Sequence, residues 1–162
     1  MTRNASAELG MDSELSPRRI RKKSSSRRHL VVVEPPRDYF VERDGDRFAG
    51  MHLLVDLWGA RNLGDPKAVE AALREAATAA EATILTAHFH HFTPNGGVSG
   101  VLVLAESHIS IHTWPERNFA AIDIFMCGAC DPHKAVPVLK RHFAPESVHV
   151  NEQRRGLERP VV

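Results

Sequence analysis

The residues best suited to chemistry are concentrated in one run of eleven, residues 106–116. The run directly follows an apolar segment, 101–105, that is typical of a buried strand. Polar side chains in such a place need hydrogen-bond partners if they are buried. A high density of titratable groups is typical of an active site. The side chains of this run that could take part in chemistry are those of Glu106, Ser107, His108, His112, Trp114 and Glu116.

Ser107 is the first candidate for a reactive group. A serine that attacks an external substrate needs a base, an orienting acid and oxyanion donors. No Gly-x-Ser-x-Gly sequence surrounds Ser107, so a lipase-type turn is absent. A serine at the corner between two strands is the structural alternative.

Four short motifs occur in order along the chain: His-Phe-Thr-Pro at 91–94, Gly-Val-Ser-Gly at 97–100, Glu-Ser-His at 106–108 and Ala-Ile-Asp-Ile-Phe-Met-Cys-Gly at 121–128. Together they resemble the bacterial S-adenosylmethionine decarboxylase family, whose members cleave themselves and make their own pyruvoyl cofactor. The similarity extends over residues 50–156. Several motifs in the right order are far more specific than a single Ser-His pair.

The resemblance implies that Ser107 attacks its own chain at the carbonyl of Glu106. Elimination from the resulting ester and hydrolysis would leave a β chain, 1–106, and an α chain, 107–162, that begins with the pyruvoyl group. The pyruvoyl carbonyl would form a Schiff base with the substrate amine and accept the electrons released with CO₂. The implied activity is decarboxylation of S-adenosylmethionine, whose product supplies aminopropyl groups for spermidine synthesis.

The resemblance assigns three further residues to the reaction. His112 matches a base in processing, and an imidazole exchanges protons near neutral pH. Ser99 matches a second processing residue, which could donate a hydrogen bond to the oxyanion. Cys127 matches the acid that returns a proton to the substrate carbon, and an ordinary thiol pKa of about 8.5 suits that task. The alternative for His112 is a structural role in its strand, and the alternative for Ser99 is a role in a turn.

Three residues match the nucleoside site of the family, namely Phe92, Trp114 and Glu116. Aromatic faces suit an adenine ring and a sulfonium cation, and a carboxylate can accept hydrogen bonds from two ribose hydroxyls. Core packing is the alternative for each aromatic residue. Arg117 departs from the family pattern and would disfavour the distal cation of a dibasic substrate if it pointed inward. That would give slight support to the nucleoside. Some members of the family decarboxylate ornithine or arginine, so this alternative stays open.

Cys127 and Cys130 form a Cys-x-x-Cys pair, a spacing that can bind zinc or exchange thiols. A zinc site would need two more ligands, of which His133 could be one. His88 and His90 share one face of a strand, but no His-Glu-x-x-His motif is present. We therefore expect no metal. A non-enzymatic module that binds metal or nucleic acid is the alternative from another class.

The bulk composition is that of an ordinary single domain, with 162 residues, 43% of them hydrophobic, and a net charge of +1. No apolar run approaches the roughly 20 residues needed to cross a bilayer, and the N-terminus does not resemble a secretory signal. Two cysteines argue against a disulfide framework. We therefore expect a cytoplasmic protein with no membrane partner.

The N-terminal part differs from the rest of the chain. Residues 1–49 are predicted to be a disordered extension, apart from a short strand at 30–33, and the decarboxylase domain is predicted to span 50–162. Seven basic residues lie within 18–28 and could contact nucleic acid, although a solvated tail is the simpler interpretation.

The elements that must position these groups follow from periodicity. Strands are predicted at 51–58, 83–92, 99–105, 109–114, 119–126 and 147–151. Asp65 and Pro66 should begin a helix over 67–80. A second helix should begin at 131 or 132, with Ala135, Val138, Leu139 and His142 on its buried side. In the first strand, Asp56 is predicted to be buried.

This order predicts an α+β fold, a two-layer sandwich of an antiparallel sheet with helices on one face. The resemblance implies the same sandwich, assembled as a homodimer of αβ protomers.

Overall fold

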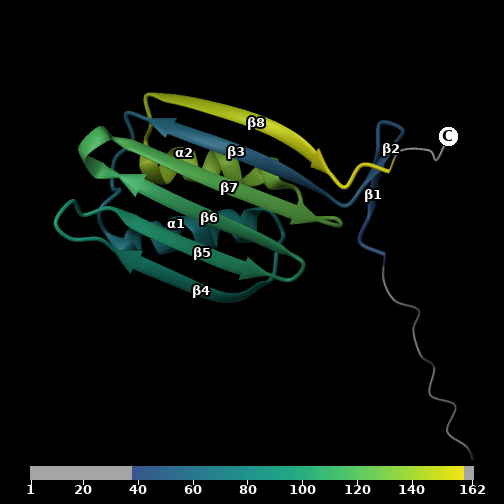
Figure 1. The fold of residues 1–162 in the computed structure, drawn as a ribbon, viewed down its shortest axis with the longest axis horizontal. Helices are drawn as coiled ribbons and strands as arrows, with labels where there is room; N and C mark the ends of the chain where they lie inside the picture. Colours follow the sequence, from purple (N-terminus) through teal and green to yellow (C-terminus); the bar gives the residue numbers. More distant parts are fainter. Residues whose placement is uncertain (1–37, 159–162) are drawn as a thin grey trace, which may run out of the picture. The chain divides into compact units, whose positions relative to one another are not determined.

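The computed structural model describes residues 38–158 and contains a six-stranded antiparallel sheet with two helices on one face (Figure 1). The strand order is β4-β5-β6-β7-β3-β8. The predicted α+β sandwich is confirmed. The strand bounds are β3 Gly50–Trp58, β4 Ile84–His91, β5 Val98–Leu104, β6 Ser107–Trp114, β7 Phe119–Cys127 and β8 Ser147–Arg155.

The central strands alternate between a face packed on the helices and a helix-free face. In β3 the side chains of Met51, Leu53, Val55 and Leu57 are buried, which follows from the period of two in a strand. The sequence predicts that Asp56 is buried too. This prediction is wrong, because Asp56 is out of step with the apolar set and lies half-buried on the helix-free face.

The first helix, α1 (Pro66–Ala79), begins where the sequence predicts. The side chain of Asp65 accepts a hydrogen bond from the backbone nitrogen of Lys67 at 2.9 Å, and Pro66 occupies the first turn. The stripe that α1 buries against the sheet includes Val69 and Leu73. Within the described part of the chain, no helix is long and apolar enough to span a membrane.

The second helix, α2 (Ala135–Phe143), follows a short 3-10 helix, η2 (Pro132–Lys134). Its buried residues include Val138 and Leu139, as predicted, but Phe143 completes the stripe in place of His142. His142 lies at the edge of the stripe, where its Nε2 contacts the carboxylate of Glu75 on α1. A phenyl ring gains more from burial than an imidazole, and the imidazole gains an ion pair at the edge.

A β-hairpin precedes the sheet, formed by β1 (Val41–Arg43) and β2 (Asp46–Phe48). Asp44 and Gly45 connect the two strands with φ of 55° and 82°, as hairpin turns require. The prediction of disorder up to residue 49 is therefore wrong for residues 41–48. The strand predicted at 30–33 and the basic cluster lie outside the described residues.

The helix-free side of β3, β5, β6 and β7 is named the open face. It carries exposed apolar side chains, which are Leu54, Trp58, Val103 and Trp114. Three of its aromatic rings form a stack across adjacent strands. The Phe119 ring lies 4.3 Å from that of Trp58 and 5.3 Å from that of Trp114. The open face therefore combines exposed apolar side chains with polar ones in a single copy of the chain.

Candidate functional site

The turn between β5 and β6 places Ser107 at the start of β6. Leu104 pairs with Ser107, so only Ala105 and Glu106 form the turn. Glu106 has a φ of 61°, in the left-handed region that costs a non-glycine residue about 1–2 kcal/mol. The peptide bond between Glu106 and Ser107 therefore follows a strained residue.

Ser107 lies against the end of β7. It is 8% exposed, and its Oγ accepts a hydrogen bond of 3.0 Å from the backbone nitrogen of Cys127. Because β6 and β7 are antiparallel, the first residue of one strand meets the last residue of the other. The structure thus brings together two of the four residues that the sequence predicts to be reactive.

The thiol of Cys127 is partly buried close to negative charge. Burial raises the pKa of Cys127 above its ordinary value, and the nearby charges of Glu106 and Cys130 raise this pKa further. The thiol is therefore protonated at neutral pH. A proton donor must be in this state before it acts.

The two cysteines of the Cys-x-x-Cys pair, Cys127 and Cys130, are both free thiols. His133, which the sequence suggests as a further zinc ligand, instead contacts the carboxylates of Asp131 and Glu152 at 3.2 and 3.0 Å. In the described part of the chain, no group of three or more His, Cys, Asp and Glu side chains is placed to hold a metal ion.

The histidines are spread over the sheet. His88 and His90 pair with alternate residues of β5 and so share a face, as predicted. On the open face, burial and then the nearby His52 lower the pKa of His108. His52 Nε2 lies 3.4 Å from Asp123 Oδ1 without the geometry of a hydrogen bond. The contact between His52 and Asp123 is not predicted from the sequence, although His52 stands out as a histidine within the apolar strand β3.

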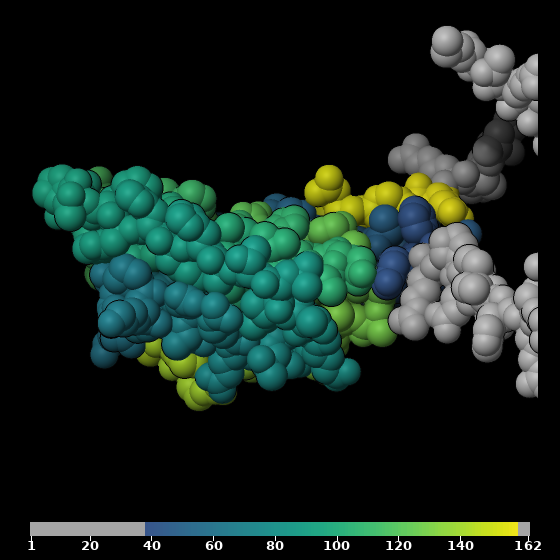
Figure 2. All heavy atoms as spheres, turned by 90° about the horizontal axis from the view of Figure 1, so that it is seen from below, coloured from purple at the N-terminus to yellow at the C-terminus, as the bar shows by residue number. Residues whose placement is uncertain are grey.

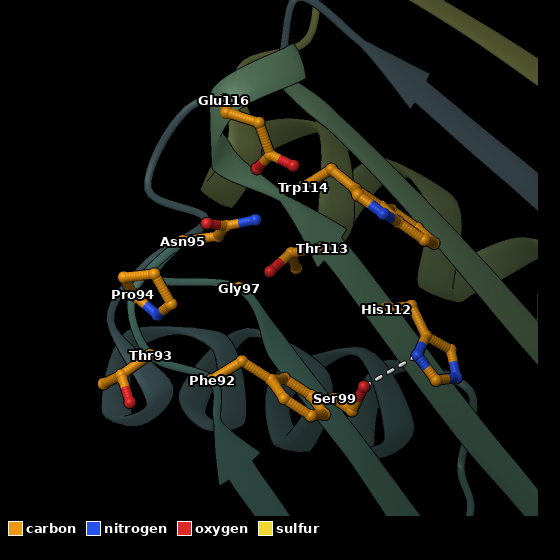
Figure 3. A pocket seen from close by; sticks show the side chains of 10 residues that line it. All are labelled: Phe92, Thr93, Pro94, Asn95, Gly97, Ser99, His112, Thr113, Trp114 and Glu116. Atoms are coloured by element: carbon orange, nitrogen blue, oxygen red, sulfur yellow. Dashed lines mark hydrogen bonds between the residues drawn. The ribbon is translucent and has the colours of Figure 1, made fainter.

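A cavity of about 480 Å³ lies at the opposite end of β6 from Ser107 (Figure 3). This volume is in the range typical of small-molecule sites. The cavity collects five residues that the sequence assigns to processing or substrate binding, namely Phe92, Ser99, His112, Trp114 and Glu116.

Ser99 and His112 form a direct pair in this cavity. Ser99 Oγ and His112 Nδ1 are 2.7 Å apart, and the two residues lie opposite each other on β5 and β6 (Figure 3). The imidazole is on the open face, and its ring centre is 6.1 Å from that of Trp114. The strand register thus assembles a hydroxyl–imidazole pair beside an aromatic side chain.

The predicted substrate residues come from three different segments. Figure 3 shows Phe92 on the loop after β4, Trp114 at the end of β6 and Glu116 in the short helix η1 (Pro115–Arg117). Phe92 and Trp114 are 49% and 40% exposed, so neither is a core residue of the single chain. The structural alternative of core packing is therefore wrong for both.

Two neighbours of these residues change the prediction. Arg117 does not line the cavity, so its charge offers no argument about the substrate. Asn95 does line it, and its amide points toward the same part of the cavity as the carboxylate of Glu116 (Figure 3). The sequence assigns no substrate-binding role to Asn95.

The predicted residues therefore form two groups at opposite ends of the sheet. Ser107 and Cys127 lie at one end, and Ser99 and His112 at the other. Ser107 and His112 are five positions apart on an extended strand, a distance of about 16 Å, and their side chains point to opposite faces. His112 cannot reach the Ser107 of its own chain in this structure.

The part of this chain that matches known proteins contains the six-stranded sheet and its two helices. The family model described as S-adenosylmethionine decarboxylase matches residues 51–156. The S-adenosylmethionine decarboxylase proenzyme of Thermomicrobium roseum is 44% identical over 109 residues, which cover 67% of this chain and 94% of the relative. The proenzyme of Pyrococcus furiosus is 40% identical over 112 residues, which cover 67% of this chain and 80% of the relative.

A solved structure agrees with these relatives. The adenosylmethionine decarboxylase of Aquifex aeolicus superimposes with a TM-score of 0.63 at 31% identity, over 71% of this chain and 97% of that one. Fold and site thus define a two-layer α+β enzyme with a serine at a strained turn. The chain belongs to the S-adenosylmethionine decarboxylase family.

Proposed function

We propose that this decarboxylase proenzyme cleaves itself between Glu106 and Ser107, and that the pyruvoyl group formed from Ser107 decarboxylates S-adenosylmethionine. The observation that carries this assignment is the contact of 3.0 Å between Ser107 Oγ and Cys127 at a strained turn. The product would be the aminopropyl donor for spermidine synthesis.

Self-cleavage needs only groups of the chain and water. Ser107 Oγ adds to the carbonyl carbon of Glu106, the C–N bond breaks, and an ester takes its place. Removal of the Cα proton breaks the Cβ–O bond, which leaves a carboxylate on Glu106 and a dehydroalanine. Water then releases ammonia and leaves the pyruvoyl group. Relief of the left-handed strain at Glu106 favours departure from the starting amide.

Ser99 and His112 are the proposed processing residues. The imidazole is suited to remove the Cα proton of the ester, and the Ser99 hydroxyl can stabilise an oxyanion. Their contact of 2.7 Å fixes the ring and the hydroxyl relative to each other. A base oriented by a hydrogen-bonded neighbour is a recurring arrangement in such chemistry.

The pyruvoyl carbonyl supplies the electron sink for loss of CO₂. The site fits this group, because its precursor Ser107 is buried next to the Cys127 backbone. Cys127 is the proposed acid that returns a proton to the substrate carbon. The burial that raises its pKa keeps the proton on the sulfur until it is needed.

Phe92, Trp114 and Glu116 are the proposed substrate contacts. Two partly exposed aromatic rings in a cavity of about 480 Å³ suit an adenine ring and a sulfonium group. Glu116 can accept hydrogen bonds from ribose hydroxyls. Ornithine and arginine have a cation but no adenine ring to stack on the aromatic surfaces, so the cavity favours the nucleoside.

The active unit is proposed to be a homodimer that pairs two open faces. Each chain has Ser107 and Cys127 at one end of the sheet and Ser99 and His112 at the other. A two-fold axis that runs across the strands would bring the first pair of each chain to the second pair of its partner. The exposed apolar side chains of the open face would become buried in the same step.

Intact-mass measurement of purified protein tests the proposal. The wild type should yield two chains, divided after Glu106, and the second chain should react with a carbonyl reagent. Ser107→Ala should stay whole. CO₂ release from S-adenosylmethionine, and not from ornithine or arginine, would establish the substrate. A wild-type chain that stays whole after long incubation would refute self-processing.

A further inference from the structure

The hairpin of β1 and β2 precedes residues 51–156, which match the family, yet its own contacts fasten it to the sheet. Arg154 of β8 donates hydrogen bonds to Asp44 and Asp46, each at 2.6 Å. Its guanidinium lies 5.3 Å from the centre of the Phe48 ring. Phe48 is 1% exposed and belongs to the core.

A second set of contacts joins the hairpin to the segment after β8. The backbone nitrogen of Glu158 donates to the carbonyl of Arg47 at 2.8 Å, and the backbone nitrogen of Ala49 donates to the carbonyl of Arg155 at 2.8 Å. The Arg154 side chain is only 27% exposed and bonds two carboxylates at once, so it contributes to the fastening together with the buried ring and the backbone bonds. Figure 2 shows the hairpin in dark blue against the yellow end of β8.

The chain just before β1 contacts the turn that follows Cys127. The backbone nitrogen of Gly128 donates to the carbonyl of Tyr39 at 3.1 Å. A Cβ at Gly128 would lie 3.5 Å from Tyr39 Cδ1, so the ring packs directly on this turn. Val41 and Cys130 line a cavity of only about 20 Å³ beside the turn, which has room for about one water molecule.

We propose that this hairpin is a clamp on the Cys127 turn, with Tyr39 as a positioning residue for the thiol. The inference rests on the proposed role of Cys127 as proton donor. Tyr39 contacts no reacting group and acts through the backbone of Gly128. A group that delivers a proton to one carbon must be held close to a single geometry, and the strand pairing of β7 ends with Cys127, directly before the turn that Tyr39 contacts.

The clamp holds the turn directly after a partly buried thiol. Burial is the main cause of the raised pKa of Cys127. A loosened hairpin would admit water to the turn and stabilise the thiolate, so this pKa would fall toward its ordinary value. The thiol would then react faster with an alkylating agent and would be a weaker proton donor at alkaline pH.

The test uses the full-length chain with Cys130→Ser, which leaves Cys127 as its single thiol. Asp44→Asn combined with Asp46→Asn removes both carboxylates that hold Arg154. Glu70→Gln is the matched control, because it removes an exposed ion pair on α1. The rate of Cys127 alkylation by iodoacetamide is measured across pH, together with kcat and KM for S-adenosylmethionine.

The double variant should be alkylated about threefold faster at neutral pH, with a lower apparent pKa. Its kcat should fall with KM unchanged, because no residue of the hairpin lines the substrate cavity. Tyr39→Ala should act in the same direction and keeps both anchors if the double variant fails to fold. Alkylation and kcat equal to those of the Glu70→Gln control would overturn the clamp. A wild type that is never cleaved would refute the proposed function instead, and the alkylation comparison would still test the clamp.

Discussion

Ser107 and Cys127 are twenty positions apart in the chain, and yet the backbone nitrogen of Cys127 donates a 3.0 Å hydrogen bond to Ser107 Oγ. The antiparallel pairing of β6 with β7 produces this contact. A carbonyl group formed from Ser107 would thus arise beside the backbone of the residue whose thiol is proposed to protonate the substrate. The other proposed processing pair, Ser99 and His112, lies at the far end of the same strands.

Mixed dimers should reveal whether the two pairs act across chains. A chain with Ser107→Ala and a chain with His112→Ala should each stay whole when expressed alone. When they are coexpressed with different tags, the His112→Ala chain should be cleaved, because it meets the intact His112 of its partner. Intact-mass measurement identifies the cleaved chain. Mixed dimers that form without any cleavage would show that processing occurs within one chain.

The charge of Glu106 should set the alkaline limit of decarboxylation. Cys127 donates a proton, so activity should fall as the pH rises through the pKa of this thiol. After burial, the negative charge of Glu106 is the next cause that raises this pKa. Glu106→Gln should therefore move the alkaline limb of the kcat profile to lower pH.

Glu81→Gln is the matched control for the charge of Glu106. Glu81 raises the pKa of Cys130, the other thiol of the pair. The substitution should leave the alkaline limb in place. Equal shifts in the two variants would indicate a general change of the surface potential, and no shift in Glu106→Gln would contradict a role of Cys127 as the titrating donor.

Glu116→Gln should weaken substrate binding more than catalysis. Loss of a charged acceptor for ribose hydroxyls should raise KM about tenfold, which corresponds to about 1.4 kcal/mol. Steady-state CO₂ release measures kcat and KM separately. Arg117→Ala is the neighbouring control, and its KM should match the wild type because Arg117 does not line the cavity. A drop in kcat alone for Glu116→Gln would place this carboxylate in the chemical step instead.

Thr113→Val should destabilise the fold by about 1–3 kcal/mol. Thr113 is 6% exposed, and its Oγ1 donates to the carbonyl of Leu63 at 2.8 Å and accepts from the backbone nitrogen of Val98 at 2.7 Å. Valine keeps the shape and leaves both groups unpaired. Urea unfolding measures the difference. Thr78→Val on the exposed side of α1 is the control and should change stability by no more than about 0.5 kcal/mol.

The periodic elements of this fold are predictable from the sequence. The Asp65–Pro66 start of α1 and the apolar strands predicted at 51–58 and 119–126 are local signals, and the structure confirms them. The hairpin of β1 and β2 is missed because its stability depends on Arg154, more than a hundred positions away. Local composition contains no trace of that partner.

The site is only partly predictable, because contacts between strands depend on register. Ser107 and His112 are close in sequence, but an extended strand carries them apart and turns them to opposite faces. Ser99 and His112 are distant in sequence and are joined at 2.7 Å. The types and order of the residues predict which side chains belong to the site. The pairing of β5, β6 and β7 decides which of these side chains lie together.

The strand order has a consequence for the cleaved protein. A break after Glu106 would assign β3, β4 and β5 to one product and β6, β7 and β8 to the other. In the sheet, β3 of the first product lies between β7 and β8 of the second, and all nine of its residues pair on both sides. The break would remove one covalent link and change only the terminal pair of β5 and β6, Leu104 with Ser107. The two fragments should consequently melt in a single cooperative transition and exchange partners no faster than the whole molecule unfolds.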